Sequence, residues 1–595
     1  MGAQPGDCID SNTFSLASHE ADNLTEEQSA ESIATHFAEI SQQFPPLDIA
    51  NLPLHVQNKL KCQDKAPVVT EFEVYNKLRA AKKPRSGIPN DLPKVIIQEF
   101  CPELALPVSK IVNSISSTGE WPKQWKLEHI VPIGKIPLPE SEDDLRPISL
   151  TAFFSKVCEH FVVMWLLDYI KDKIDFRQYG GFKGNSITHY IIEFINFILS
   201  CQDSTDQTAI LACMVDFAKA FNRQNHGILI RKLSDMGVPA WLLRIVIGFL
   251  TERSMYVRYK GKLSSTKSLP GGGPQGTLLG LLLFIVLIND VGFTGQVNNT
   301  GELITSKRNM RSINEIHLKY VDDLTLAEAI NLPDKLESVP EDVRPMPDMY
   351  HARTGHIMPN QLENSRVLQQ LVKTKQYADE NDMKLNFKKT KMMIFNPCTS
   401  IDFMPQFVLD DQEIEVVEEM RVLGITITSD MKWATNTNIM VTRANKKLWV
   451  LRRLKDSGAK EDDLVDIYCK QVRSLLELAV PAWHGGINKD DQMDIERIQK
   501  SACHIILGED YTSYRNALKS LNLEALSVRR DKLCLKFAKR AEKHPKHRHW
   551  FKLNENDVNT RQDKLKYKDV FAKHNRFKKS PLAFLTGMLN DHYNT

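Results

Sequence analysis

The chain has 595 residues, of which 42% are hydrophobic and 25% are charged, and these values are typical of a folded protein with several domains. The longest apolar run, Leu278 to Ile288, is too short to span a bilayer and predicts a buried helix, so we expect no membrane partner. Ten cysteines without CxxC or zinc-like spacing, and no evident signal peptide, favour reduced thiols in an intracellular protein of the nucleus or cytoplasm.

The charge distribution is uneven although the net charge is only +3. Residues 1–60 carry roughly −8 and residues 529–580 roughly +12, so an acidic leader precedes the fold and a basic tail follows it. A basic tail suits a phosphate backbone, although it is also compatible with a solvated helical surface. The histidines around His547 lie in this basic run, and we expect them to be polar surface.

The N-terminal half predicts a short disordered segment, helices and two strands. Residues 1 to about 30 are polar and predict disorder, whereas Ile33, Phe37 and Ile40 predict a short amphipathic helix. A basic turn is expected at 83–89. A strand is expected at 129–133, and Pro132 would place it at a sheet edge.

Further strands and helices are predicted in the second half. The expected elements are a strand at 210–215, a helical pair at 227–252, a helix at 366–383, and strands at 392–395 and 421–428. Residues 294–314 and 331–360 have the composition of long loops or insertions. From about residue 434 the pattern becomes helical and increasingly basic.

Two acidic motifs suggest chemistry. Tyr320-Val321-Asp322-Asp323 lies between short apolar runs and predicts a hairpin with the acids at its turn, although a solvated turn would give the same pattern. Asp216 follows an apolar strand, where it could also cap a helix. Acids from two strands would meet at one sheet edge, where two divalent ions could support phosphoryl transfer.

A glycine-rich loop and two cations complete the pattern. Residues 270–276 read Pro-Gly-Gly-Gly-Pro-Gln-Gly and precede an apolar helix, so the backbone could approach a phosphate, or the segment could be a plain turn. Lys135 and Arg146 would suit a triphosphate, although each alone could be a solvated surface charge.

The order of these motifs resembles the reverse transcriptase domain of LINE-type (non-LTR) retrotransposons, over roughly residues 65–430 and more weakly over the helical region to about 550. The series is Lys135, Arg146-Pro-Ile-Ser-Leu, Gln178-Tyr-Gly-Gly-Phe, Asp216 with Lys-Ala-Phe, Gly273-Pro-Gln-Gly, Tyr320-Val-Asp-Asp, Leu385-Asn-Phe-Lys-Lys-Thr-Lys, and Val422-Leu-Gly. Single motifs of this kind are weak, but this many in order are specific.

The resemblance implies a role for each matching residue. Asp216 and Asp322 would be the main ligands of two Mg²⁺ ions (Mn²⁺ is also possible), with Asp323 as a third, less direct acid and the Phe217 carbonyl as a further ligand. In the substrate site, Lys135 and Arg146 would bind the triphosphate, Phe221 would exclude a ribose 2′-OH, Gln275 and Gly276 would position nucleotide and template, and Lys389 or Lys391 would protonate pyrophosphate. The sequence does not distinguish the two lysines.

The resemblance also implies an α+β fold, the right hand of polymerases, with fingers, an antiparallel palm sheet and a helical thumb. The boundaries expected are an acidic, partly disordered leader at 1–64, fingers and first palm elements at 65–209, palm at 210–430, a thumb-like region at 431–550 and a basic tail at 551–595. Residues 422–425 would match a primer-gripping hairpin.

The implied function is that of an RNA-directed DNA polymerase, a nucleotidyltransferase that extends a DNA primer on an RNA template with dNTPs. The alternative is a catalytically inactive or co-opted nucleic-acid-binding relic. Leu281, which replaces a common proline, and the lack of a recognisable endonuclease segment favour this alternative. The sequence leaves the oligomeric state open.

Overall fold

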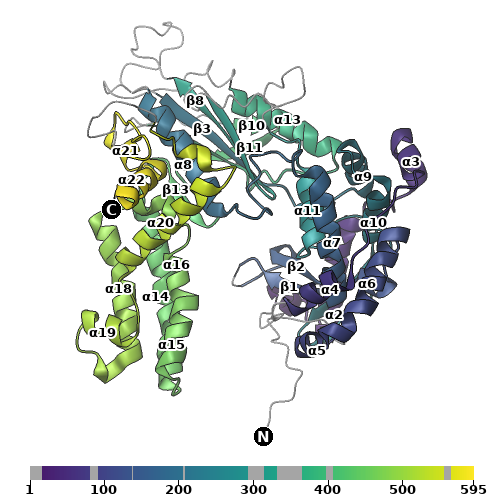
Figure 1. Cartoon of the computed structure of the whole chain (residues 1–595), viewed down its shortest axis with the longest axis horizontal. Coiled ribbons are helices and arrows are strands. Elements are labelled where there is room, and N and C mark those ends of the chain that lie inside the picture. Colours follow the sequence, from purple (N-terminus) through teal and green to yellow (C-terminus); the bar gives the residue numbers. More distant parts are fainter. Residues whose placement is uncertain are drawn as a thin grey trace. The chain divides into compact units, whose positions relative to one another are not determined.

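The structure, a computed structural model, describes residues 16–80, 91–136, 138–204, 208–292, 314–331, 365–396, 407–554 and 565–594. These residues divide into two units, each made from separate stretches of the chain (Figure 1). Unit 1 comprises Met1–Asp175, Phe217–Val291 and Lys375–Leu385, and unit 2 comprises Phe176–Asp216, Gly292–Thr374 and Asn386–Thr595. The basic turn expected at 83–89 and nearly all of the two expected insertions lie outside the described residues.

Unit 1 is a small sheet surrounded by helices. Its strands are β1 (Leu127–Gly134), β2 (Leu145–Leu150), β4 (Arg253–Tyr259), β5 (Lys262–Leu263) and β6 (Lys267–Leu269), in the order β2-β1-β4-β5 with β6 also on β4. Its helices are α1 (Ala17–Ala21), α2 (Glu26–Gln42), α3 (Leu54–Leu60), α4 (Glu71–Arg79), α5 (Lys94–Glu99), α6 (Cys101–Thr118), α7 (Phe153–Ile170), α9 (His226–Asp235), α10 (Ala240–Leu250) and α11 (Leu278–Leu287).

Helix α2 contains the amphipathic segment expected from the sequence. It begins earlier than predicted because Thr25 and Gln28 form a capping box that satisfies the first backbone N–H groups. Ile33 and Phe37 are buried against β4 and its neighbours, in an apolar cluster that also contains Val257. The expectation of disorder up to residue 30 is therefore wrong for residues 17–21 and 26–30, which are helical.

The position of Pro132 corrects a second expectation. Strand β1 is not an edge strand, because β2 and β4 flank it on both sides. Pairing with β4, however, ends at Ile130, whereas pairing with β2 continues to Gly134. Pro132 therefore lies where β1 has a single paired neighbour, so its missing N–H removes no bond to β4.

Unit 2 is built on a larger, mostly antiparallel sheet in the order β10-β11-β9-β3-β8-β7. The strands are β3 (Thr208–Val215), β7 (Glu315–Tyr320), β8 (Asp323–Asn331), β9 (Lys391–Phe395), β10 (Phe407–Leu409) and β11 (Gln412–Val416). Every residue of β3 is buried, as its continuous apolar sequence predicts for a central strand. Helix α8 (Ile187–Ser204) packs on β3 and β7, and α13 (Arg366–Glu380) precedes β9.

A two-residue hairpin connects this sheet to the C-terminal helices. The apolar pattern predicted one strand over 421–428, whereas the resemblance implied a hairpin at 422–425. The structure has two strands, β12 (Glu419–Val422) and β13 (Ile425–Thr428), paired antiparallel. Leu423 and Gly424 form the turn with φ values of +48° and +94°. The single-strand prediction was wrong because leucine is not a residue that normally marks a turn with positive φ.

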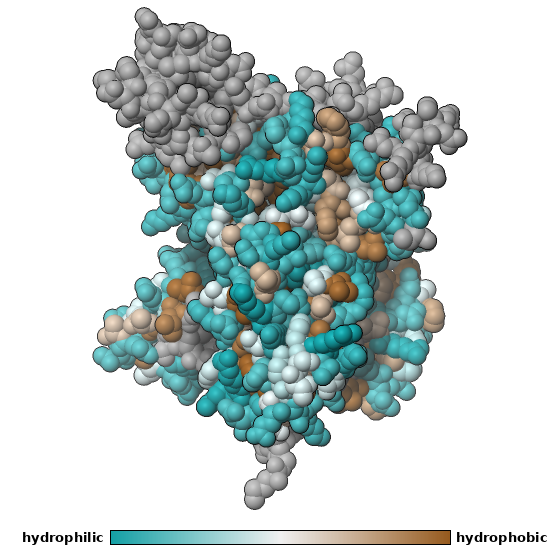
Figure 2. All heavy atoms as spheres, turned by 90° about the vertical axis from the view of Figure 1, so that its left-hand side faces the viewer, coloured by the Kyte–Doolittle hydropathy of each residue, from teal (hydrophilic) through white to brown (hydrophobic). Residues whose placement is uncertain are grey.

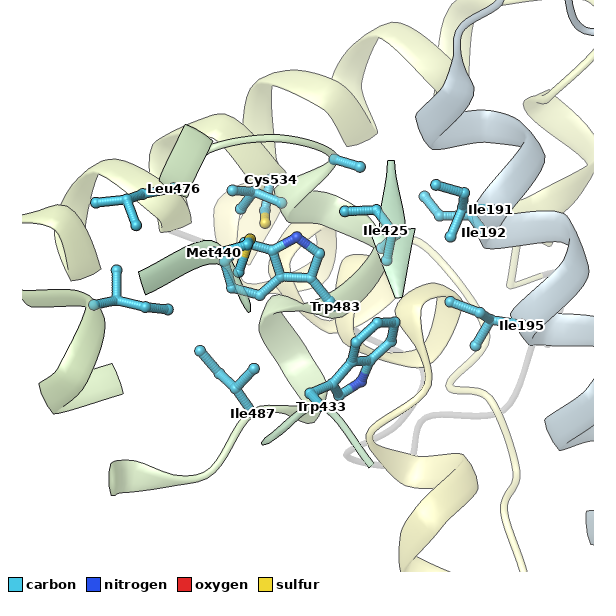
Figure 3. Close-up of a cluster of buried hydrophobic side chains, with 14 of the residues drawn as sticks. Ile191, Ile192, Ile195, Ile425, Trp433, Met440, Leu476, Trp483, Ile487 and Cys534 are labelled. Carbon is cyan, nitrogen blue, oxygen red and sulfur yellow. The ribbon is translucent and has the colours of Figure 1, made fainter. Parts of the chain in front are cut away.

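The C-terminal part of unit 2 is helical, as predicted. Its helices are α14 (Ala434–Asp456), α15 (Glu461–Ile467), α16 (Ser474–Leu476), α17 (Val480–Trp483), α18 (Lys489–Leu507), α19 (Tyr514–Ser520), α20 (Leu526–Lys543), α21 (Asn575–Lys578) and α22 (Pro581–Asn594). Trp433 and Trp483 lie at the centre of an apolar cluster into which Ile195 of α8 and Ile425 of β13 also project (Figure 3). The C-terminal helices and the helix that covers the sheet therefore share one core.

His547 is buried, which contradicts the expected polar surface. Its side chain stacks on His189 with ring centroids 4.1 Å apart, and its Nε2 lies 2.8 Å from Oδ1 of Asn185. Burial, followed by the neighbouring His189 and Lys546, lowers the pKa of His547 to about 2, so the ring is neutral.

No described helix is long and apolar enough to cross a membrane. The cysteines among the described residues are free thiols.

Candidate active site

The Tyr-Val-Asp-Asp segment forms the hairpin that the sequence predicts. Tyr320 pairs with Asp323, so Val321 and Asp322 form the turn between β7 and β8, and Asp323 is the first residue of β8. Val321 has a φ of +59°, a conformation that β-branched residues rarely adopt. The turn therefore requires support from its surroundings.

That support comes from Gln178, which is 3% exposed. Its Oε1 accepts hydrogen bonds from the backbone N–H of Val321 (3.0 Å) and from that of Gly180 (2.9 Å). A Cβ at Gly180 would lie 2.6 Å from Cγ2 of Val321, so only glycine fits this approach. The Gln-Tyr-Gly-Gly-Phe motif thus holds the strained turn, a role that sequence reasoning did not assign.

Asp216 follows β3 at the same end of the sheet. Val215 pairs with Leu324, so the next pair in this antiparallel register would be Asp216 and Asp323. The Asp216 N–H donates to Oγ1 of Thr390 (3.3 Å), and its carbonyl accepts from the N–H of Asn386 (2.8 Å). The main chain of Asp216 is therefore fixed by the segment that precedes β9.

The three carboxylates interact electrostatically. Burial of the Asp323 carboxyl by surrounding atoms, followed by the charges of Asp322 and Asp216, raises its pKa to about 7, whereas Lys389 lowers it. Asp323 still exposes part of its surface to solvent, so we attribute the shift mainly to the two like charges. The end of β3 and the β7–β8 turn thus carry an excess of negative charge.

Carboxylate oxygens are the donors that Mg²⁺ prefers, and the excess negative charge is what a cation would neutralise. The chemistry of these carboxylate donors therefore fits divalent ions. Among the described residues, no three His, Cys, Asp or Glu side chains already surround a common point as metal ligands would. The fit rests on donor type and charge, and no coordination geometry follows from it.

The two motif lysines differ in their surroundings. Lys391 forms an ion pair with Glu415 of β11. Lys389 is exposed, and its charge acts on the carboxyl of Asp323. The structure therefore separates two residues that the sequence could not distinguish.

In unit 1, Phe221 lies in a turn supported by the glycine-rich loop. Its carbonyl accepts a hydrogen bond from the N–H of Gly273 (2.8 Å). Its ring stacks on Phe284 of α11, with centroids 4.9 Å apart and an interplanar angle of 24°. A Cβ at Gly273 would come within 2.7 Å of Nε2 of Gln224, so any larger residue would require the Gln224 amide to move. The loop therefore fixes the backbone of Phe221, and α11 fixes its ring.

The other predicted residues of unit 1 are also located. Ser149 of β2 donates its N–H to the carbonyl of Gln275 (2.9 Å), and Gly276 has a φ of +111°. Phe217 is buried and forms an isolated bridge with Leu385.

The two predicted cations lie on paired strands. Arg146 is paired with Ile133 of β1, and Lys135 follows the end of that strand, so both lie at one end of the β1–β2 hairpin. Both are exposed. The Lys135 Nζ donates to the carbonyl of Asp143 (2.5 Å). Unit 2 thus brings together the three acids and Lys389, and unit 1 connects β2 to the glycine-rich loop and Phe221.

Comparison with known proteins matches part of the chain to a family. Residues 136–345 match the family described as reverse transcriptase (RNA-dependent DNA polymerase). The chain contains a reverse transcriptase domain. The matched residues include Arg146, Phe221 and the three acids, whereas Lys135 and Lys389 lie outside the match.

The chain is also similar to polymerases of mobile elements, over segments of different length. The probable RNA-directed DNA polymerase from transposon BS of Drosophila melanogaster is 23% identical over 549 residues, which cover 87% of the chain and 54% of that protein. The RNA-directed DNA polymerase from the mobile element jockey of Drosophila melanogaster is 30% identical over 228 residues, 38% of the chain and 24% of that protein. The chain thus spans about half the length of the first relative and about a quarter of the second. The predicted resemblance to non-LTR retrotransposon reverse transcriptases is confirmed.

Among solved structures, a telomerase from Candida tropicalis covers 74% of the chain at 11% identity, with 60% of its own chain covered and a TM-score of 0.34. A score this low carries no further argument. The mixed α/β content of the reverse transcriptase domain agrees with the predicted fold class at that level.

Proposed function

We propose that the chain is an RNA-directed DNA polymerase that extends a DNA primer on an RNA template with dNTPs. The observation that carries the proposal is the convergence of Asp216, Asp322 and Asp323 at one end of the unit 2 sheet, inside the segment that matches reverse transcriptases. Phosphoryl transfer between nucleotides needs carboxylates from separate strands at one place.

We further propose that the fold is the right hand of polymerases. The sheet that carries the acids would be the palm, residues 65–209 would supply fingers and first palm elements, and 431–550 a helical thumb. The β12–β13 hairpin, at the position of the expected primer grip, supports this assignment. An acidic leader at 1–64 and a basic tail at 551–595 complete the proposed organisation.

In the proposed mechanism, Asp216 and Asp322 would hold two divalent ions, with Asp323 and the Phe217 carbonyl as further ligands. Bound Mg²⁺ would lower the pKa of the primer 3′-hydroxyl and stabilise the leaving oxygen. The Gln178 amide keeps Asp322 in place through Val321. Lys389, which faces Asp323, is the better candidate to protonate pyrophosphate, because the Lys391 ammonium is engaged by Glu415.

We assign substrate selection to residues of unit 1. Phe221 would exclude a ribose 2′-OH, and its stacking on Phe284 supports this role, because a steric gate needs a ring that does not move aside. Lys135 and Arg146 would hold the triphosphate. Gln275 and Gly276 would position nucleotide and template.

The decisive experiment is primer extension on an RNA template with Mg²⁺ and dNTPs, comparing the wild-type chain with Asp322→Ala. We expect extension by the wild type and none by the variant. Asp379→Ala is the matched control, since among the described residues this exposed aspartate of α13 forms its ion pair with Lys375 on its own helix, and the variant should leave extension unchanged. A wild-type chain that binds primer–template but never extends it would instead identify a nucleic-acid-binding relic.

A further inference from the structure

The segment that follows α20 contacts the loop that carries Gln178. We call residues 544–550 the clamp segment. It starts after α20 ends at Lys543 and closes with a single 3-10 turn at Arg548–Trp550. Figure 2 shows the side of the molecule on which α18, α19 and α22 lie in Figure 1, and this face is largely hydrophilic. Charge alone therefore distinguishes no single cation of the C-terminal region, whereas contacts do.

Contacts with α8 fix the clamp segment in place. The indole N–H of Trp550 donates to Oε2 of Glu193 on α8 (2.8 Å), and both side chains are buried. The neutral ring of His547 stacks on His189 of the same helix. Because α8 also packs on β3 and β7, the clamp segment is fixed to the sheet that carries the acids.

Lys546 is the residue of the clamp segment that reaches the main chain of the loop. Its ammonium donates to the carbonyl of Gln178 (3.0 Å) and lies 3.8 Å from the centroid of the Tyr179 ring. A cation over an aromatic face is attracted by the ring, so the carbonyl and the ring hold the ammonium together. Lys546 is half-buried, and water therefore weakens these contacts less than it would at a fully exposed lysine.

The carbonyl of Gln178 needs a donor from outside the sheet. The segment around it forms a parallel bridge with Lys319 of β7, whose N–H donates to the carbonyl of Arg177 (3.1 Å) and whose carbonyl accepts from the N–H of Tyr179 (2.8 Å). In this pattern the flanking residues form the bonds, so the carbonyl of Gln178 is directed away from β7. Gln178 is buried, and a buried carbonyl requires a hydrogen-bond donor. Lys546 supplies it.

The main-chain position of Gln178 determines where its side chain can act. Its Oε1 accepts from the N–H of Val321 (3.0 Å), and this bond holds the turn that contains Asp322. A side chain of fixed length reaches Val321 only while its own main chain stays in place. Lys546 thus acts on the turn through two hydrogen bonds in series, both within unit 2. It lies beyond residues 136–345, so the match to reverse transcriptases assigns it no role.

We propose that Lys546 is a positioning residue for the polymerase reaction, which fixes the Val321–Asp322 turn through the main chain of Gln178. The inference rests on the proposed function, because it names a residue that serves the same acids. In this role Lys546 touches neither nucleotide nor metal. Its loss should lower the rate of the chemical step and leave dNTP binding unchanged, since the residues proposed to hold the dNTP belong to unit 1.

The test compares Lys546→Met with the wild-type chain. Methionine keeps much of the apolar stem of lysine and removes the ammonium, so a half-buried position should still pack. Lys455→Met is the matched control, because Lys455 of α14 is also half-buried in unit 2 and also donates to a main-chain carbonyl, that of Ile506 on α18 (2.7 Å). Lys546→Arg is the conservative variant, since a guanidinium can also donate to a carbonyl and lie over a ring. Unfolding midpoints verify that all variants fold.

Hydrogen exchange of the Val321 amide, measured on the full chain without nucleic acid, reports on the turn itself. A hydrogen bond from a charged donor corresponds to about tenfold or more in an opening equilibrium, so exchange at Val321 should accelerate by about tenfold in Lys546→Met. It should stay within about twofold of the wild type in Lys455→Met and Lys546→Arg. Equal exchange in the two methionine variants would overturn the proposal.

Single-turnover primer extension at increasing dNTP concentration separates the rate from binding. In Lys546→Met the maximal rate should fall by about tenfold or more, because a small displacement of a reacting group is costly, while the half-saturating dNTP concentration stays within about twofold. Lys546→Arg should restore the rate. Weaker primer–template binding with unchanged exchange at Val321 would overturn the proposal, because it would identify Lys546 as a phosphate contact. A wild type that extends no primer, together with fast exchange in Lys546→Met, would refute the proposed function and still support the hold of Lys546 on the turn.

Discussion

The support of the acidic turn by Gln178 gives the sharpest prediction. Gln178→Met preserves the length of the side chain but removes the oxygen that accepts from Val321 and Gly180. Leaving a buried backbone N–H unpaired costs about 1–3 kcal/mol. Gly180 is buried and Val321 is half-buried, so water can compensate part of the second loss.

We therefore expect the free energy of unfolding to fall by about 2–4 kcal/mol, the sum of one full and one partial penalty. Val321 should also relax from its positive φ, because a β-branched residue stays there only while its surroundings hold it. Urea unfolding measures the first effect, and hydrogen exchange at the Val321 and Gly180 amides measures the second. Primer extension by the folded variant should be weaker, since Asp322 is no longer fixed.

Gln202→Met is the matched control, because Gln202 is also a buried glutamine of unit 2 but bonds to the carbonyl of Phe395, away from the turn. It should leave exchange at Val321 unchanged. If Gln178→Met changes stability by less than about 0.5 kcal/mol and exchange at Val321 stays slow, the turn is held by other contacts and the reasoning is refuted.

Three further predictions test separate parts of the chain. Burial raises the pKa of Glu159 from 4.5 to about 7, so the folded chain binds the extra proton and stability should fall by up to about 3 kcal/mol as pH rises between these values. Glu159→Gln should remove that slope in a pH series of unfolding curves, and an unchanged slope would contradict the assignment. Phe221→Val should let the chain incorporate rNTPs if Phe221 is the proposed steric gate, whereas an unchanged dNTP/rNTP ratio would disprove that role. Lys389→Gln should slow single-turnover extension more than Lys391→Gln, and the reverse order would exclude Lys389 as the proton donor.

The acidic hairpin and the strand before Asp216 could be predicted because local pattern determines both. A fully apolar run predicts a central strand, and β3 is buried along its whole length. An acidic pair between two short apolar runs predicts a turn, and the turn lies at Val321 and Asp322. That the two acids meet at one sheet edge was a hypothesis from the chemistry of two-metal phosphoryl transfer, which the resemblance then supported, since the pairing of distant strands leaves no local signal.

The features that the sequence did not reveal depend on tertiary contacts. Leu423 adopts a positive φ without being a typical turn residue, so the apolar pattern alone predicted one strand where the resemblance implied a hairpin. Lys389 and Lys391 are equivalent in sequence, and only the position of Glu415 on a neighbouring strand separates them. Gln178 was recognised as part of a motif, but its role could be assigned only once the structure placed Val321 beside it.

His547 shows why charge patterning misjudged the C-terminal region. A run of lysines, arginines and histidines predicts a solvated surface, and for Lys536 and Arg540 this is correct. His547 belongs to the same run, yet it lies buried as a neutral ring against His189. The difference arises because α20 ends at Lys543 and the chain then turns into the core, where Lys546 reaches Gln178. The basic region therefore has two parts with different surroundings: α20 exposes cations at the surface, and the segment after it contacts the loop that holds the Val321–Asp322 turn.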